Sequence, residues 1–191
     1  MGYKVPAGIS NRHIHLSKED FEVLFGKGKE LTFFKKLSQP GQFAAEEKVD
    51  VLGPKGATIK NVRILGPFRE QTQVELARTD CYAIGMPLVL RNSGDLAGTP
   101  GCKLIGPEGE VEIGEGVIVA RRHIHLSPEQ AAEAGVKDGD IVSVKFDGER
   151  SLIFNEVLIR SGESHYLDFH MDTDEANAAS LVNSQEGEIL K

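Results

Sequence analysis

The chain has 191 residues, with 22 Lys and Arg against 29 Asp and Glu, which gives a net charge of −7 at pH 7. This negative charge argues against nucleic acid as a partner, although a local basic pocket for a small anion is still compatible with it. No apolar run approaches the roughly 20 residues that cross a bilayer, so we expect no membrane partner. Two cysteines, Cys81 and Cys102, cannot build a disulfide framework and favour a cytoplasmic location.

Short runs of β-prone residues, separated by glycine and proline, follow one another along the chain. Strands are expected before the turns at 53–56, 106–109 and 147–148. Helices are few: Ser17 and Ser127 are typical N-caps, and a third helix begins at Thr173. This alternation predicts a mainly β protein built from small β-barrels with short helical caps, rather than a βαβ sheet.

An internal duplication organises these elements. The hexapeptide Arg-His-Ile-His-Leu-Ser occurs at 12–17 and again at 122–127, an offset of 110. Downstream, 62–66 resembles 157–162 at an offset near 95, so the first copy contains about 15 additional residues. We place them in an inserted loop at 25–45 and expect two barrels, one formed by residues 12–120 and the other by 121–191.

The duplicated hexapeptide contains four of the six histidines. In a strand, residues i and i+2 point to the same face, so His13 and His15 can aim both imidazoles at one point, as can His123 and His125. Imidazole is a common ligand of zinc and other first-row metals. One such pair could simply face solvent on an edge strand. Two pairs in one duplicated chain favour metal binding.

Three further residues are candidates for the same site. His170 lies beside the acidic segment 172–175, which could alternatively serve only as a helix N-cap. Glu75 is a carboxylate between apolar neighbours and could also be a surface residue of an amphipathic strand. Arg69 lies on a turn after a strand, where its guanidinium fork suits phosphate or carboxylate unless it is only solvated.

Together with 37–44, 66–69 and 172–177, the two hexapeptides resemble the PduL-type phosphate propanoyltransferases, also called phosphotransacylases, from about Val5 onward. The resemblance implies an acyltransferase that moves a short acyl group between coenzyme A and inorganic phosphate, with acyl-CoA, phosphate and acyl phosphate as its ligands. It also implies two zinc ions in an active site between the two barrels. The N-terminal strand 2–11 should then complete the second barrel.

The resemblance also implies roles for individual residues. His13 and His15 correspond to the ligands of the first zinc, and Arg69 corresponds to the phosphate-binding residue. Four residues correspond to the ligands of the second zinc: Glu75, His123, His125 and His170. Four others correspond to coenzyme A contacts: Ser10, Asn11, Lys36 and Asn177. His165 corresponds to no ligand.

The expected chemistry is direct attack of zinc-positioned phosphate on the thioester. Lysines 27, 29, 35 and 36 form a local positive cluster that can meet coenzyme A phosphates. The first motif begins at Val5, which leaves no room for the amphipathic extension that targets relatives to microcompartments. We therefore expect a free cytoplasmic enzyme that prefers acetyl to propanoyl groups, and a homo-oligomer is compatible with the sequence.

Two other functions fit part of the pattern. A cupin-like oxygenase or isomerase also uses His-X-His, a glutamate and a later histidine, but with one metal per barrel. A non-catalytic metal-binding module would leave Arg69 and the lysines unexplained. A count of two zinc ions per chain and an acyl-transfer assay would distinguish these functions.

Overall fold

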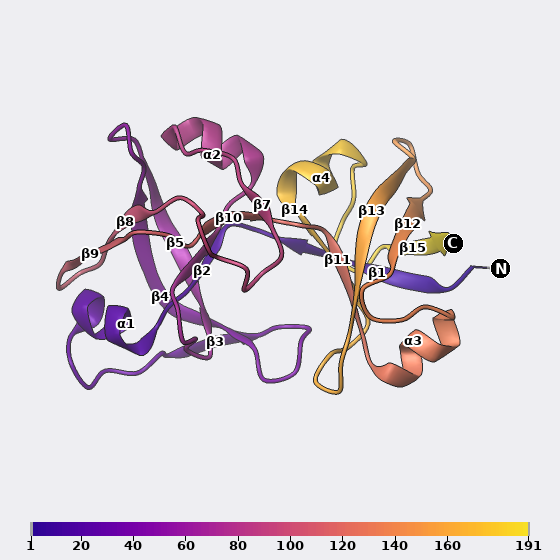
Figure 1. Ribbon diagram of the computed structural model, residues 1–191, viewed down its shortest axis with the longest axis horizontal. Helices are drawn as coiled ribbons and strands as arrows, with labels where there is room; N and C mark the ends of the chain where they lie inside the picture. The colour runs from indigo at the N-terminus through magenta and orange to yellow at the C-terminus, as the bar shows by residue number, and fades with distance from the viewer. Residues whose placement is uncertain (1, 191) are drawn as a thin grey trace. The chain divides into compact units, whose positions relative to one another are not determined.

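The computed structural model describes residues 2–190, which form two compact units. The barrel unit contains the chain up to Asn11, Ser38–Pro40, and the chain from Arg121 onward. The sheet unit contains Arg12–Leu37 and Gly41–Ala120. Figure 1 shows the elements of both units along the chain. The first hexapeptide begins at Arg12, where the chain enters the sheet unit. The second begins at Arg122, one residue after the chain returns to the barrel unit.

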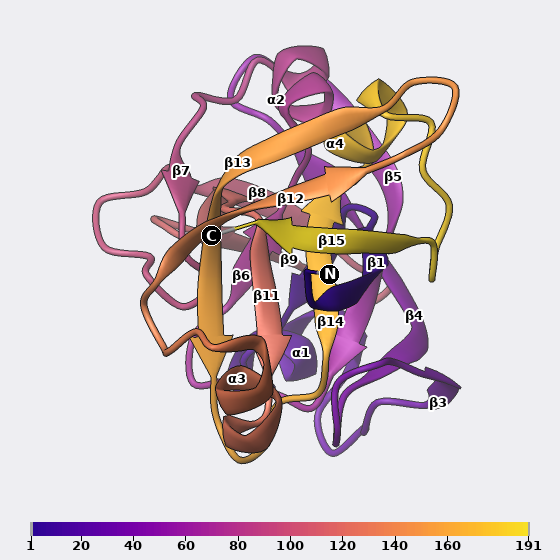
Figure 2. The same cartoon turned by 90° about the vertical axis from the view of Figure 1, so that its right-hand side faces the viewer.

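The barrel unit is a closed barrel with the strand order β1-β14-β11-β13-β12-β15. Figure 2 shows β12, β13 and β15 of this barrel side by side. Its strands are β1 (Lys4–Ser10), β11 (His123–Leu126), β12 (Ile141–Phe146), β13 (Leu152–Ser161), β14 (Asp168–Asp172) and β15 (Glu186–Leu190).

The barrel is closed by strands from opposite ends of the sequence. β1 pairs in parallel with β14 and antiparallel with β15, so that Lys4 lies opposite Glu188. Inward-facing residues fill the barrel, and the rings of Phe146, Phe154 and Phe169 pack with centroids 5.9–6.0 Å apart. Because the core uses side chains from both ends of the chain, the barrel depends on β1.

The sheet unit is a nine-stranded sheet whose main path runs β7-β10-β6-β2-β5-β4-β8-β9, with β3 paired to β4. The mainly β prediction is confirmed, but only one of the two sheets closes; this one curls and keeps two edges. Its strands are β2 (His13–His15), β3 (Phe33–Lys36), β4 (Phe43–Leu52), β5 (Thr58–Gly66), β6 (Gln73–Glu75), β7 (Leu90–Arg91), β8 (Cys102–Ile105), β9 (Glu110–Ile113) and β10 (Val117–Ala120).

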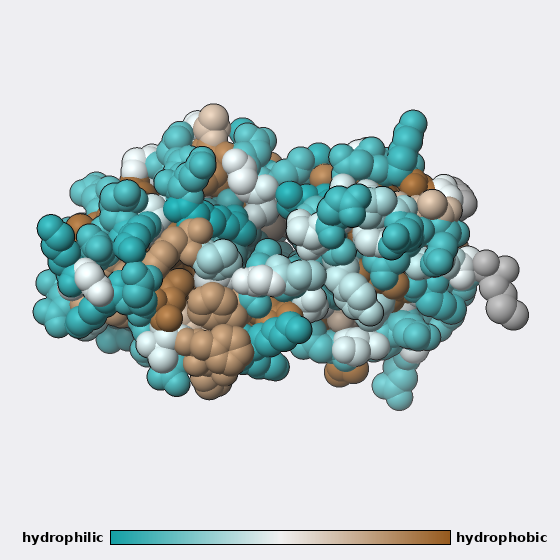
Figure 3. Space-filling model, turned by 90° about the horizontal axis from the view of Figure 1, so that it is seen from below, coloured by the Kyte–Doolittle hydropathy of each residue, from teal (hydrophilic) through white to brown (hydrophobic). Residues whose placement is uncertain are grey.

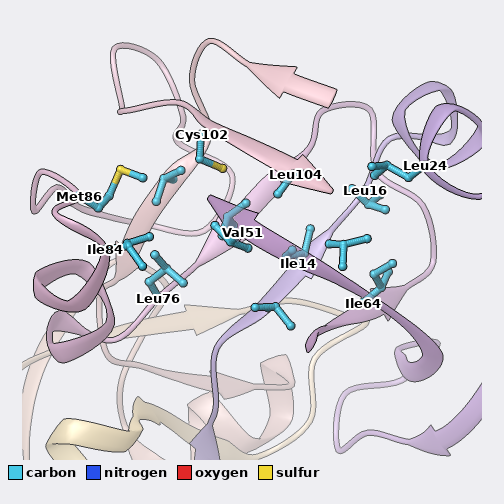
Figure 4. Packing of buried hydrophobic residues seen from close by; sticks show 14 of the residues in the cluster. Ile14, Leu16, Leu24, Val51, Ile64, Leu76, Ile84, Met86, Cys102 and Leu104 are labelled. Atoms are coloured by element: carbon cyan, nitrogen blue, oxygen red, sulfur yellow. The ribbon is translucent and has the colours of Figure 1, made fainter. Parts of the chain in front are cut away.

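Alternating apolar residues of the sheet form a single core. Figure 4 shows Ile14, Val51 and Ile64 gathered with Leu24 and Ile84 of the covering helices. All five of these side chains are buried, which is the expected pattern for a curled sheet with one face covered. This core holds β2 at the centre of the sheet.

Four short helices cover the ends of the sheets in residues 2–190. They are α1 (Lys18–Phe25), α2 (Arg78–Ile84), α3 (Pro128–Ala134) and α4 (Thr173–Ala178). The predicted caps are present: the Ser17 and Ser127 hydroxyls accept backbone N–H groups of α1 and α3, and Asp172 caps α4. Helix α2, which no capping pattern in the sequence had suggested, follows β6.

The duplication is visible in strand pairing. β2 lies between β5, in parallel, and β6, antiparallel. β11 lies between β13, in parallel, and β14, antiparallel. In both copies, therefore, a His-X-His strand is the middle one of three, and the same kinds of neighbour surround it.

The surface is mostly hydrophilic, with a hydrophobic area over the sheet unit in the view of Figure 3. The exposed apolar residues of this unit include Phe33, Phe34 and Val23, and the Arg63 guanidinium lies 4.4 Å from the ring centre of Phe34. Among the described helices, none combines the length and apolar character needed to cross a membrane.

Candidate metal centres

In the sheet unit, three potential metal ligands meet where β2 pairs with β6. His13 lies directly opposite Glu75 in the antiparallel register, and His15 follows on the same face of β2. The Nε2 atom of His13 and Oε2 of Glu75 are 3.5 Å apart. One ligand atom from each of the three residues lies within 4.8 Å of the others, so the group can hold a metal ion.

Arg69 lies beside this group. It comes from the loop between β5 and β6, just after the cis Gly66–Pro67 peptide bond, and its backbone N–H is held by the Leu16 carbonyl at 2.9 Å. One guanidinium nitrogen donates to Nε2 of His15 at 2.8 Å, and the other donates to the Ser93 hydroxyl at 3.2 Å. A fixed positive charge therefore lies one hydrogen bond from the ligand group.

Ser93 and Gln73 complete a network around Glu75. Oε1 of Glu75 accepts from the Gln73 amide at 2.5 Å and from the Ser93 hydroxyl at 3.0 Å. Gln73 also donates to Ser93 at 2.8 Å, while its own carbonyl accepts the Gly94 N–H at 2.8 Å. These bonds occupy one oxygen of Glu75 and leave the other facing His13.

In the barrel unit, the corresponding group consists of His123, His125 and His170. Nε2 of His123 and Nε2 of His125 are 3.1 Å apart. Nδ1 of His123 donates to the Arg121 carbonyl at 2.8 Å, so in the neutral ring Nε2 is the nitrogen without a proton. His170 is the register partner of His123 across β11 and β14, and its Nε2–H donates to Asp168 at 2.9 Å.

The geometry of both groups fits a first-row metal. Two ligand atoms at about 2.0–2.1 Å from a tetrahedral zinc lie about 3.3–3.4 Å apart. The separations of 3.1 Å and 3.5 Å found here are close to that value. In addition, Nδ1 of His125 is buried without a hydrogen-bond partner among the described residues. Imidazole and carboxylate donors in these arrangements suit zinc or a similar divalent ion.

The electrostatics keep these ligands in metal-binding protonation states. Burial, with the neighbouring His13 and Arg69, lowers the pKa of His15 to about 3. Burial and the neighbouring histidines lower the pKa of His125 to about 2. Burial alone would raise the pKa of Glu75, but His13, His15 and Arg69 hold it well below its usual value. The imidazoles of His15 and His125 are therefore neutral, and the Glu75 carboxylate is ionised, at neutral pH.

The arginine of each hexapeptide has a structural partner. Arg12 pairs with Asp80 of α2 at 2.8 Å, and Arg122 pairs with Glu175 of α4 at 2.7 Å. Each acid also accepts the backbone N–H at the N-cap position of its helix. Arg12 and Arg122 therefore tie the start of the His-X-His strand to the helix that follows the third ligand.

The structure brings together most of the predicted ligands, but in one new combination. Glu75, which the resemblance assigned to the second zinc, lies with His13 and His15 of its own unit; the assignment to the second zinc stays a prediction. His165, predicted to be no ligand, lies outside both groups, although its ring centre is 4.3 Å from that of His125.

The residues matched to coenzyme A lie on different elements. Ser10 ends β1 opposite Asp172 of β14, and the next residue is Asn11. Lys36 ends β3 and Asn177 lies on α4, and both are exposed. Their role stays a prediction.

Sequence reasoning missed Gln73, Ser93 and the hydrogen bond of Asp168 to His170. A signal for two of them existed. The offset of 95 that relates β5 to β13 continues without a gap, and it relates Gln73 to Asp168 and Glu75 to His170. Ser93 has no such counterpart, because it lies in the loop between β7 and β8.

This chain is similar to known proteins along nearly its whole length. A family model described as phosphate propanoyltransferase matches residues 6–182. A phosphate propanoyltransferase of Thermotoga maritima is 58% identical over 175 residues, which cover 91% of this chain and 83% of the relative. The proteins of that name from Salmonella typhimurium and Lachnoclostridium phytofermentans are 53% and 50% identical, covering 94% and 99% of this chain and 85% and 88% of the relatives. The chain therefore belongs to the phosphate propanoyltransferase family of acyltransferases.

Proposed function

We propose that this protein transfers a short acyl group reversibly between coenzyme A and inorganic phosphate, with two zinc ions as cofactors. The observation that carries the proposal is the position of Arg69, whose guanidinium donates to His15 in a group of three metal ligands. Inorganic phosphate is a tetrahedral dianion, and a positively charged side chain next to a metal-binding group can bind it and offset its charge. The family relationship supports the same reaction.

Arg69 binds the phosphate in this proposal. Its planar fork offers parallel N–H groups to two phosphate oxygens, and its charge offsets that of the dianion. Ser93 holds one end of the guanidinium and is itself bonded to Glu75. The side chain is thereby oriented before the substrate arrives, which lowers the entropic cost of binding.

The ligands of the two metal ions follow the family resemblance in this proposal. His13 and His15 hold the first ion, whose remaining positions are open to substrate. His123, His125 and His170, whose ligand atoms lie within 4.8 Å of one another, hold the second ion with Glu75 as its fourth ligand. When bound, zinc supplies a Lewis acid that polarises a carbonyl and accepts a thiolate.

The acyl group moves in one displacement. A phosphate oxygen attacks the thioester carbonyl carbon, the carbon–sulfur bond breaks, and coenzyme A leaves as a thiolate while acyl phosphate forms. The two cysteines are not acyl carriers: both are buried, and burial raises the pKa of Cys102 to about 12. We infer that Ser10, Asn11, Lys36 and Asn177 contact coenzyme A, with Lys36 at a phosphate.

A thiol-release assay tests the function. Acetyl-CoA and propanoyl-CoA are each supplied with and without phosphate, and both free thiol and acyl phosphate are measured. We expect thiol release only with phosphate, in equal amount to acyl phosphate, and faster with acetyl-CoA. Thiol release without acyl phosphate would indicate a hydrolase. No release, with one iron or manganese per chain, would favour a cupin-like enzyme.

A further inference from the structure

We propose that His165 is a positioning residue of the barrel metal group: its ring holds the imidazole of His125, and Gln39 of the inserted loop holds the turn that carries His165. The inference rests on the second ion of the proposed function, whose ligands include His123, His125 and His170. It gives a role to a histidine that corresponds to no ligand.

The three imidazoles of this group differ in what orients them. Nδ1 of His123 donates to the Arg121 carbonyl, and Nε2 of His170 donates to Asp168. Nδ1 of His125, in contrast, is buried without a hydrogen-bond partner among residues 2–190. An imidazole ligand is ordinarily held by a partner on the nitrogen that does not bind the metal. The His125 ring must therefore be held by something other than a hydrogen bond.

The ring of His165 packs against this imidazole. The two ring centres are 4.3 Å apart, and the ring planes are inclined at 65°. This is the edge-to-face arrangement that aromatic rings prefer, and at this distance the His125 ring cannot rotate without displacing His165. His165 is itself held, because its Nδ1 donates to the Arg160 carbonyl at 2.9 Å. The orientation of one ring therefore determines that of the other.

The turn that carries His165 is joined to the strand that it supports. The Gly162 N–H donates to the carbonyl of Leu126, at the end of β11, at 3.0 Å, and the His165 N–H donates to the Gly162 carbonyl at 2.9 Å. The imidazole of His165 lies over this glycine, since a Cβ at Gly162 would be 3.4 Å from Nδ1. The strand that carries His125 therefore also positions His165.

Gln39 holds the other end of the same turn. Its amide nitrogen donates to the Tyr166 carbonyl at 2.9 Å, and its amide oxygen accepts the Tyr166 N–H at 3.1 Å. The side chain is 3% exposed, so Gln39 takes the place of water at both backbone groups. Within the inserted loop 25–45, only Ser38–Pro40 belong to the barrel unit. This part of the loop therefore supports the barrel metal group.

The sheet unit has a comparable contact at its own histidine pair. The Arg69 N–H donates to the Leu16 carbonyl at 2.9 Å, the same kind of bond that joins the other turn to the end of its His-X-His strand. The Arg69 guanidinium then reaches Nε2 of His15. In both copies, a side chain from the turn after the parallel neighbour thus lies on the second imidazole. Because the contact occurs in both copies, we infer that it belongs to the duplicated site.

The test measures zinc affinity by competition with a chromophoric chelator. The full-length parent, His13→Ala with His15→Ala, keeps the ligands of the second ion. In this parent, His165→Ala should weaken zinc binding by about 10–100-fold, the usual effect of removing a group that orients a ligand. His165→Phe keeps a ring in place, so its affinity should stay close to that of the parent. Glu163→Ala, exposed on the same turn, is the matched control and should change nothing.

A double-mutant cycle tests the role of Gln39. Gln39→Leu should weaken zinc binding in the parent, but it should have no further effect in His165→Ala, because Gln39 acts through that ring. Ser38→Ala, exposed beside it, is the control. Circular dichroism in excess chelator verifies folding, and the absorption of bound cobalt should report the same ligand set in every variant.

Unchanged affinity in His165→Ala overturns the inference. A loss in His165→Phe as large as that in His165→Ala also overturns it, because the ring would then be insufficient, and a changed cobalt spectrum would make His165 a ligand. Additive losses refute the role of Gln39. A parent that binds no zinc overturns both the second metal site and this inference, while thiol release tests the reaction separately. Selective losses with normal folding support the inference.

Discussion

At the scale of single residues, Arg69 connects the metal ligands to the anion that the enzyme must hold. Its guanidinium is already bonded at both ends, to His15 and to Ser93, so its orientation does not depend on substrate. A lysine at this position would keep the charge but would offer a single flexible ammonium in place of a planar fork. Replacing Arg69 by lysine should therefore weaken phosphate binding more than it weakens acyl-CoA binding.

Arg69→Lys should raise the KM for phosphate by about tenfold, equivalent to the loss of one charge-assisted hydrogen bond of about 1.4 kcal/mol, and should change the KM for acyl-CoA much less. Steady-state kinetics with each substrate varied in turn measures both constants. Arg78→Lys, on the exposed face of α2, is the control and should change neither. Equal increases in the two constants would assign Arg69 a structural role.

The buried imidazoles predict how the metal-free protein responds to acid. The pKa of His15 is about 3 and that of His125 about 2 in the folded chain, against 6.5 for an exposed imidazole. Between pH 6.5 and 3 these two imidazoles bind more protons in the unfolded chain than in the folded chain. The free energy of unfolding is therefore highest above pH 6.5 and declines as the pH falls toward 3.

In excess chelator, the free energy of unfolding should therefore fall between pH 6.5 and 5.5 by about 1 kcal/mol for each of these imidazoles. Urea titrations at several pH values measure this fall. His125→Gln, which has no proton to gain, should show a shallower dependence. A stability that is constant from pH 7 to 5 would contradict the burial of these two rings.

At the scale of elements, two Gly-Pro-X-Gly turns show how closely the helices pack on the sheet. The first glycine of each turn lies under the last residues of a helix: a Cβ at Gly53 would be 2.2 Å from the Ile84 carbonyl oxygen, and a Cβ at Gly106 would be 2.5 Å from the Leu24 carbonyl oxygen. The Leu24 carbonyl also accepts the Glu108 N–H at 3.0 Å. Each turn thus helps to fix the end of one helix.

Gly106→Ala should reduce the free energy of unfolding by about 1–3 kcal/mol, because backbone must move to admit the methyl group. Gly114→Ala is the matched control: a Cβ there meets nothing within 4 Å, and its effect should be small. Chemical denaturation of both variants makes the comparison. Equal stabilities would mean that α1 can shift at little cost.

The sequence predicted several of the strands, three helices and the paired imidazoles because these depend on local patterns. Ser17 and Ser127 are N-cap residues that indicate where α1 and α3 begin. The spacing of His13 and His15 places both side chains on one strand face. Helix α2 was missed because the residue at its N-cap position, Ala77, offers no side-chain acceptor. When the two copies are aligned at the offset of 95, Asp80 corresponds to Glu175. The helix predicted at Thr173 in the second copy could therefore have indicated helix α2 in the first.

The grouping of Glu75 with His13 could not be read in the same way. It depends on the register between β2 and β6, which are separated by almost 60 residues, and a shift of one residue would turn Glu75 to the other face. The sequence also did not predict which of the two sheets closes into a barrel. Both copies have similar strand patterns, yet only the barrel unit joins its first and last strands.

At the scale of the whole molecule, the metal sites should link activity to stability. Chelation should abolish acyl transfer and lower the melting temperature by several degrees, because a metal that binds only the folded state stabilises it in proportion to its affinity and concentration. Adding zinc should restore both. Calorimetry and thiol release on the same samples measure the two effects, and full activity in a verified metal-free preparation would refute a metal-dependent reaction.

The placement of β1 in a barrel that β15 completes has a consequence for synthesis on the ribosome. The strands of the sheet unit are complete at Ala120, so that unit can form early, while β1 waits for β14 and β15. At about 5–20 residues per second, the 70 residues from 121 to 190 take roughly 4–14 s to appear. During that interval β1 is an unpaired strand edge. Lys4 and Pro6, a charge and a residue without a backbone donor, are the features that protect such an edge from pairing with another nascent chain.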